Sequence, residues 1–223
     1  MGSEMCIRDR SEAFMPQSSS GPVLQLLASG LQRWIRSQCD SAEVINLALK
    51  GSALELLRGR LQGVSLEARK VSFDQLPLMR AEIECGALKA TLRPGQPNQP
   101  VQLEAPFSIK GEVVLAGQDL NQALASDRWR WLGDLLAEQL MGLTPLRSLV
   151  IDNDQLVLTA DVITGKDPVM QRFQLCADQG TIRVDHCDAE ESLLLPMDPN
   201  IQIHSARLQG GHLVLNGQAI VQP

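Results

Sequence analysis

The apolar residues first recur at helical spacing and then change to a period of two. Between residues 22 and 38 they fall on one face of a helix that begins at Pro22. This segment predicts an amphipathic helix too short to span a bilayer. Two roles are open for it. It packs on the body of the fold, or it lies on a membrane surface and contacts it through Leu27, Leu31, Trp34 and Ile35.

Strict alternation of apolar and polar residues follows and predicts antiparallel strands. Examples are residues 45–49 and 64–68, where every second side chain is apolar. The alternation changes phase at Gly86, which predicts a β-bulge at that glycine. Residues 93–98, with two prolines and a glycine, predict a turn or loop.

The longest alternation in the chain runs over residues 101–115. Its apolar face contains Val101, Leu103, Ala105, Phe107, Ile109, Gly111, Val113 and Leu115. As a single strand it would extend ~50 Å at ~3.4 Å per residue, so it must bend and twist. Pro106 lies on the polar face and indicates a sheet edge or a bulge.

Helical spacing returns over residues 117–124 and again from about residue 127 to Gly142. Short alternating segments and turn residues fill the remainder, which predicts further strands. The predicted fold class is therefore α+β, with a large antiparallel sheet and two principal helices. A sheet that is apolar on one face must be covered. Incomplete cover by helices would leave an elongated apolar groove able to hold an acyl chain.

Composition excludes one class of function and leaves another open. Aromatic residues make up only 3% of the chain and the net charge is −6, so a nucleic-acid binder is not expected. The C-terminal third, residues 151–223, carries four basic and ten acidic side chains. Residues 50–93 are mildly basic, which suits either anionic lipid or an ordinary solvated surface.

No recognisable catalytic or metal-binding motif is present. The three histidines and five cysteines lack the spacing of a zinc site or a disulfide framework. His186 and Cys187 are adjacent on a predicted strand, so their side chains point to opposite faces. We therefore expect neither enzymatic activity nor a cofactor nor a metal. Trp129 and Trp131 fit either an interfacial membrane anchor or one core and one partly exposed residue.

Residues 1–20 are predicted to be foreign to the native protein. The string at Met5–Arg10 looks like translated sequencing adapter, so we exclude residues 1–20 as a non-native leader. We expect the native N-terminus, and any signal peptide with it, to be missing. Residues 21–223 are predicted to form one domain.

Two short motifs carry a family resemblance. One is RLQGVSLEA at residues 60–68, which follows a Leu-rich segment closed by Gly59. The other is VLAGQDLNQAL at residues 114–124, where the long strand meets the next helix. In these motifs and in the order of its elements, the chain resembles the domain of unknown function 2993 family, also called LmeA-like, and in particular its cyanobacterial members. Gly117 and Gln118 depart from the Thr-Glu usual at that helix start.

The resemblance implies a half-barrel like the tubular lipid-binding (TULIP) proteins, with a strongly curved antiparallel sheet wrapped around or against one or two helices. It implies binding of phospholipid or a similar lipid, without catalysis, at a membrane or in the cell envelope. The candidate groove residues are Val101, Leu103, Phe107, Ile109, Val113, Leu115, Leu132 and Leu136. The alternative is a packed scaffold or protein-interaction domain of the envelope with no ligand channel, its protein partners unknown.

Overall fold

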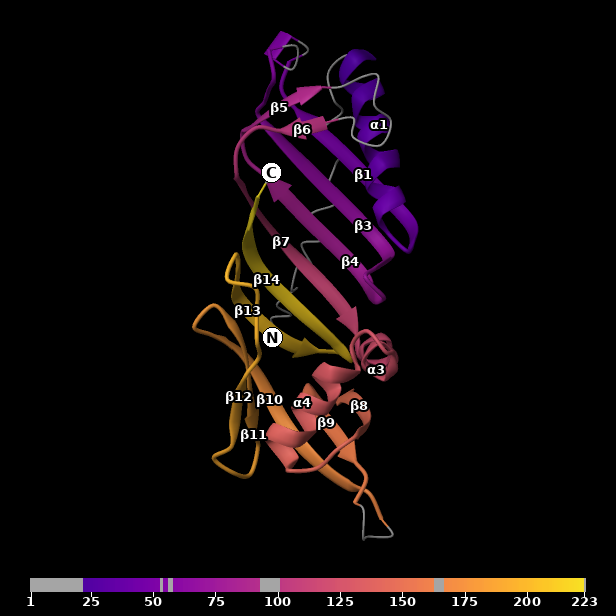
Figure 1. Ribbon diagram of the computed structural model, residues 1–223, viewed down its shortest axis with the longest axis vertical. Coiled ribbons are helices and arrows are strands. Elements are labelled where there is room, and N and C mark those ends of the chain that lie inside the picture. The colour runs from indigo at the N-terminus through magenta and orange to yellow at the C-terminus, as the bar shows by residue number, and fades with distance from the viewer. Residues whose placement is uncertain (1–21, 53, 56–57, 93–100, 163–166, 223) are drawn as a thin grey trace, which may run out of the picture.

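The computed structural model describes residues 22–52, 54–55, 58–92, 101–162 and 167–222. Figure 1 shows an elongated body with a large sheet and α1 toward one end and a smaller sheet with α3 and α4 toward the other. The helices are α1 (Pro22–Gln38), α3 (Gly117–Ala125) and α4 (Arg130–Met141).

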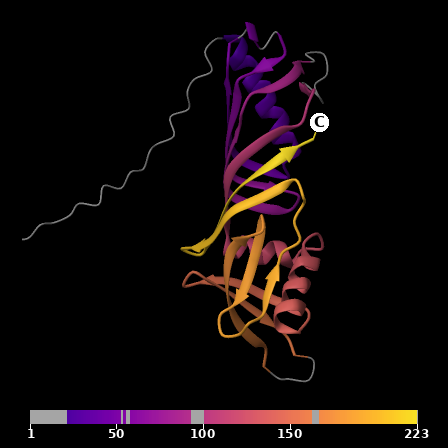
Figure 2. The ribbon, with the colours of Figure 1, turned by 90° about the vertical axis from the view of Figure 1, so that its left-hand side faces the viewer.

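The first sheet has six antiparallel strands in the order β1-β3-β4-β7-β14-β13. Their bounds are Ser41–Lys50 (β1), Gly63–Phe73 (β3), Leu76–Cys85 (β4), Phe107–Ala116 (β7), His212–Val221 (β14) and Ile201–Gln209 (β13). Between its edges β1 and β13 the sheet is strongly curved and does not close into a barrel (Figure 2).

The strand register places apolar residues on one face of this sheet, called the inner face below. Three successive cross-strand rows contain only apolar residues, cysteine and glycine. The first is Ile45, Ala68, Ala81, Val113, Leu215 and Ala206. The second is Leu47, Leu66, Ile83, Gly111, Gly217 and Ile203. The third is Leu49, Val64, Cys85, Ile109, Ala219 and Ile201.

The intervening rows form the outer face and are polar. One of them is Asn46, Glu67, Glu82, Glu112, Asn216 and Ser205. Neighbouring carboxylates on a sheet repel one another. Here Arg80 lies between two of them, 3.5 Å from Glu82 and 2.5 Å from Glu112. The period of two in the sequence therefore becomes a sheet with one apolar and one charged face.

Helix α1 covers the inner face at the β1 edge. Its Ala28 is buried with Leu49 and Leu61, and its Ile35 packs on the cluster around Ile45. The Gln32 side chain donates a hydrogen bond to the Ile45 carbonyl. Such bonds occupy backbone groups that an edge strand otherwise leaves unpaired.

A second, five-stranded antiparallel sheet forms the other end of the molecule, in the order β12-β11-β10-β9-β8. Its strands are β8 (Leu146–Asp152), β9 (Gln155–Ala160), β10 (Val169–Asp178), β11 (Thr181–His186) and β12 (Ser192–Leu194). Together with α3 and α4 it encloses the largest core cluster, in which Leu158 and Phe173 are fully buried. Leu115, Leu213 and Ala206 of the first sheet join that cluster.

The 101–115 alternation is not one strand, contrary to the sequence prediction. The chain leaves strand geometry between Leu103 and Phe107, around Pro106. The first part, β6 (Val101–Leu103), belongs to a small sheet with β5 (Leu88–Leu92) and β2 (Arg60–Leu61). The β-bulge predicted at Gly86 is also wrong, because β4 ends at Cys85 and the chain passes to that small sheet. At Pro106 and at Gly86 the chain passes between the small sheet and the first sheet, and this passage accounts for the break in strand geometry and for the change of phase.

The predicted fold class is confirmed. The chain is α+β, and its large curved antiparallel sheet packs against helices. The helix predicted over residues 22–38 has those bounds in the structure. The β13–β14 hairpin turns at Gly210 and Gly211, both of which have a positive φ.

Candidate functional site

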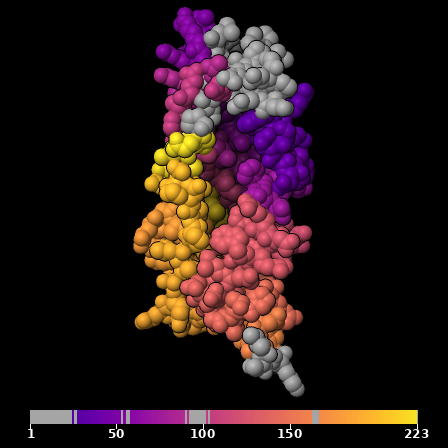
Figure 3. Space-filling view, viewed as in Figure 1, coloured from indigo at the N-terminus to yellow at the C-terminus, as the bar shows by residue number. Residues whose placement is uncertain are grey.

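A large apolar cavity lies between the inner face of the first sheet on one side and the second sheet with α3 and α4 on the other. It has a volume of about 540 Å³ and is open to the surface. That volume falls in the range of about 300–1,000 Å³ typical of ligand sites. Figure 3 shows the hollow between the yellow C-terminal strands, the purple strands of the first sheet and the salmon-coloured α3–α4 region.

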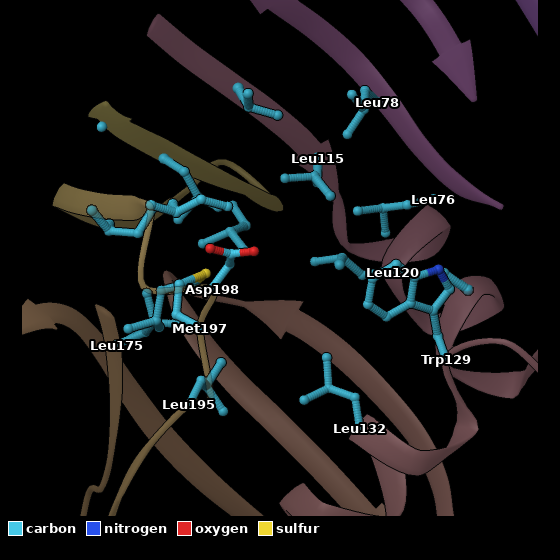
Figure 4. A pocket seen from close by; sticks show the side chains of 18 of the residues that line it. Leu76, Leu78, Leu115, Leu120, Trp129, Leu132, Leu175, Leu195, Met197 and Asp198 are labelled. Carbon is cyan, nitrogen blue, oxygen red and sulfur yellow. The ribbon is translucent and has the colours of Figure 1, made fainter. Parts of the chain in front are cut away.

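Both the first sheet and the part of the molecule formed by the second sheet, α3 and α4 contribute residues to the cavity wall. Figure 4 shows Leu78 and Leu115 from the first sheet, with Trp129 and Leu132 from the α4 region across from Leu175, Leu195 and Met197. Of the described lining residues, only Lys110, Asp198 and Gln218 have a charged or amide side chain. An apolar wall this continuous fits a hydrocarbon ligand, because it offers very few groups that could pair with polar atoms.

Two glycines pair with each other across β7 and β14 on the inner face, and both line the cavity. A Cβ atom at Gly111 would lie 2.2 Å from the Glu82 carbonyl oxygen, and one at Gly217 would lie 2.5 Å from the Gln202 carbonyl oxygen. Neither glycine has a positive φ, so close approach of the neighbouring backbone requires them here. They keep side chains out of the middle of the cavity floor.

Specific contacts hold α4 against the first sheet at the cavity rim. Arg128 makes a bidentate pair with Asp74 at the β3–β4 turn, with nitrogen–oxygen distances of 2.6–3.0 Å. The Trp129 indole N–H donates to the Asp74 carbonyl over 2.9 Å, and its ring stacks on Trp131. The carboxylate and the carbonyl of one turn residue therefore fix the position of two rim residues.

The second family motif has a structural role at this site. Leu120 lines the cavity, and Asn121 Oδ1 accepts a hydrogen bond of 2.8 Å from the Leu149 backbone N–H. Gly117 packs tightly, since a Cβ there would lie 3.1 Å from the Ile151 side chain. The motif joins α3 to the second sheet and shapes the cavity without placing a reactive group in it.

The cavity floor is long enough for an acyl chain. Ile109 and Leu115 both line it, and the six residue steps between them extend ~20 Å along β7 at ~3.4 Å per residue. An acyl chain in a bilayer occupies one leaflet, ~15 Å of the ~30 Å hydrocarbon core.

The structure gathers most of the predicted groove residues at this cavity. Five of them line it: Ile109, Val113, Leu115, Leu132 and Leu136. Phe107 lies instead at a separate pocket, with Leu61 and Leu88. The side chains of Val101 and Leu103 lie outside the described residues. Contact of any of these residues with lipid stays a prediction.

The four residues predicted to contact a membrane lie on α1. Leu31 and Ile35 pack on clusters in the body of the protein. Trp34 is half-buried, and the Leu27 side chain lies outside the described residues. Helix α1 therefore packs through part of the face that was considered for membrane contact. Among the described helices, none has the length and apolarity needed to cross a membrane.

Several lining residues escaped the sequence analysis as site residues. Leu175, Leu195, Met197 and Ile203 come from strands and a loop far along the chain from β7. Their alternation identified strands but could not show which face borders open space. The signal that could have found them is the pairing of the strands, which a single sequence does not contain.

The residues considered for catalysis form no reactive cluster. Burial raises the pKa of the Cys187 thiol, with a further contribution from Asp188, which disfavours a thiolate nucleophile. The His186 ring packs edge-on against Phe173, and its Nδ1 accepts from the Asp188 backbone N–H. Over the described part of the chain, no group of three or more His, Cys, Asp or Glu side chains could hold a metal ion.

Comparison with known proteins gives one assignment. Searches of curated proteins and of solved structures found no match. The family model described as LmeA-like phospholipid-binding matches residues 20–218, nearly the whole chain. The apolar cavity, the curved open sheet and this match agree, and the chain belongs to the LmeA-like phospholipid-binding family.

Proposed function

We propose that this protein is a non-enzymatic carrier of phospholipid, which acts at a membrane surface or in the cell envelope as a single domain over residues 21–223. The cavity between the first sheet and α3–α4 holds at least one acyl chain, and the headgroup stays at the mouth. The observation that carries the proposal is a 540 Å³ cavity whose described wall is almost wholly apolar.

Energetics favour reversible exchange with a bilayer. Each buried methylene contributes about 0.8 kcal/mol relative to water. An acyl chain that moves from a bilayer into this cavity leaves one apolar environment for another, so most of that free energy is retained. Binding of the acyl chain from water is then strong, whereas its transfer between the bilayer and the cavity changes the free energy little. A carrier requires both properties.

The alternative of a packed scaffold receives no support from the geometry. That hypothesis expected a core without a connected cavity, whereas the described residues line a large one that opens to the surface. A catalytic role receives no support either, because the lining residues that the structure describes include no nucleophile next to a base.

Membrane contact fits the cavity rim better than α1. Trp131 lines the cavity at its rim, and half of its surface is exposed. Phe73, beside the Asp74 that binds Arg128, is also exposed. Exposed aromatic side chains next to an apolar opening suit the interfacial layer of a bilayer, where Trp is enriched. A lipid could then enter the cavity without crossing water.

The test uses a variant that fills the cavity. Ala219 lines the cavity and lies between Ile109 and Ile201 in the third apolar row, so Ala219→Trp inserts an indole there. We expect this variant to lose most of the lipid that the wild type takes up from phospholipid vesicles, measured by lipid extraction and mass spectrometry.

The matched control is Ala48→Trp. Ala48 pairs with Ser65 in a row of the outer face, away from the cavity lining. This variant should take up lipid like the wild type. Equal uptake by wild type and Ala219→Trp, with both folded, would contradict the proposed site.

A further inference from the structure

Of the three charged or amide residues that line the cavity among the described residues, two have side-chain partners on the outer face of the first sheet, and the third is a carboxylate. Lys110 pairs with Glu84 at 3.5 Å and belongs to an outer-face row. Gln218 lies in the same row, and its side chain bonds Gln202 over 2.8 Å. Both side chains are therefore engaged on the outer face. Asp198, in the segment between β12 and β13, is the acidic residue left among the described lining residues.

Hydrogen bonds hold the Asp198 side chain in place, but it has no ion-pair partner among the described residues. Its Oδ1 accepts hydrogen bonds from the Asn200 backbone N–H at 2.8 Å and from the Asn200 amide at 2.9 Å. Its Oδ2 accepts none from the described residues, and no described basic side chain forms an ion pair with it. Figure 4 shows the two carboxylate oxygens among the apolar side chains of the cavity.

We propose that Asp198 makes the cavity selective for phospholipids whose headgroup carries a cationic nitrogen, and that it disfavours headgroups with a net negative charge. This inference rests on the proposed function, because it places the acyl chain in the cavity and the headgroup at its mouth. Asp198 lines the cavity and is also exposed to solvent, which puts this residue at the mouth. An ammonium there pairs with the free Oδ2, while an anionic headgroup meets a like charge.

The charge balance of this part of the sequence has the same sign. Asp198 belongs to the C-terminal third, which has four basic and ten acidic side chains. Since the mouth is open to water, the attraction is screened and its size is that of an exposed ion pair. We expect an enrichment of about three- to fivefold for a cationic-nitrogen headgroup over an anionic one.

The experiment is a competition among headgroups. The full-length protein is incubated with vesicles of phosphatidylethanolamine, phosphatidylcholine and phosphatidylglycerol in equal amounts, all with the same acyl chains. The protein is re-isolated, and its lipid is extracted and quantified by mass spectrometry. Ethanolamine presents N–H donors and choline does not. The ratio of these two lipids therefore separates a hydrogen bond to Asp198 from charge attraction alone.

Two variants isolate the carboxylate. Asp198→Asn keeps an oxygen that can accept from the Asn200 backbone while removing the charge. Asp188→Asn makes the same charge change at an exposed residue that does not line the cavity. We expect Asp198→Asn to lose the enrichment, Asp198→Lys to reverse it toward phosphatidylglycerol, and Asp188→Asn to retain it.

The outcomes separate this inference from the function on which it depends. Lipid bound by the wild type in the same ratio as in the vesicles would overturn the selectivity, as would an enrichment unchanged in Asp198→Asn. In both cases the carrier function would stand. A wild type that binds none of the three lipids would overturn both proposals.

Discussion

A methyl group at Gly111 tests whether the two strands at the cavity floor are as close as the structure indicates. A Cβ atom there would lie 2.2 Å from the Glu82 carbonyl oxygen and 3.1 Å from the Ile83 Cα atom. Both atoms are backbone, so neither can move aside by a side-chain rotation. In Gly111→Ala, β4 and β7 must therefore separate until the first contact reaches at least 3.0 Å.

That separation has a calculable cost. Moving the strands apart lengthens the hydrogen bonds around this pair beyond their usual ~2.7–3.2 Å. Forced overpacking costs about 1–3 kcal/mol, and each weakened hydrogen bond costs up to about 0.5–1.5 kcal/mol. The lower entropy of the unfolded alanine chain offsets about 0.4–1 kcal/mol. We expect a net loss of about 2–3 kcal/mol in the free energy of unfolding.

Urea denaturation followed by circular dichroism measures this loss, with Gly86→Ala as control. A Cβ at Gly86 meets no atom within 4 Å, and its φ is not in the left-handed region. The control should be unchanged or slightly more stable. If Gly111→Ala proves as stable as Gly86→Ala, the strands are not in the close contact described, and the account of an open cavity floor fails.

Three further perturbations follow from the packing, the charges and the rim. Phe173 is fully buried in the largest core cluster, so Phe173→Ala should lower the free energy of unfolding by about 3–5 kcal/mol in urea denaturation, and a loss below about 1 kcal/mol would contradict that burial. Burial of Glu112 raises its pKa, but hydrogen bonds from Asn216 and Arg80 outweigh burial and leave the pKa below its ordinary value of 4.5. The stability that these bonds give is present above pH 4.5 and is lost as pH falls below it, so melting curves of Glu112→Gln should show a flatter acid dependence than wild type. Trp131→Ala should lower the melting temperature slightly, because it removes the stacking on Trp129, and should weaken co-sedimentation with phospholipid vesicles, because half of the Trp131 surface is exposed at the rim; equal co-sedimentation would exclude that rim as the membrane contact.

Local pattern was enough to predict most of the elements. The period of two places Ile109, Val113 and Leu115 on one face wherever the strand lies, and the 22–38 helix follows from its apolar spacing and Pro22. The sequence does not distinguish a bend, a bulge and a change of sheet at Pro106, because all three leave the same alternation. Only strand pairing distinguishes them, and pairing is a long-range property.

The cavity itself could be anticipated as a possibility but not located. An apolar sheet face can border a packed core or open space, and Val113 has the same pattern in either case. Leu175 and Met197 join the wall through the packing of the second sheet on the first. Asp198 had no signal at all, since a lone acid in a loop is usually a solvated surface residue.

The most direct test of the central claim is native mass spectrometry of the gently purified protein, with lipid extraction of the same sample. The account predicts a mass increase that corresponds to phospholipid, restored by incubation with vesicles after delipidation and lost in Ala219→Trp. A wild-type protein that is folded, carries no lipid and takes up none from vesicles would contradict it.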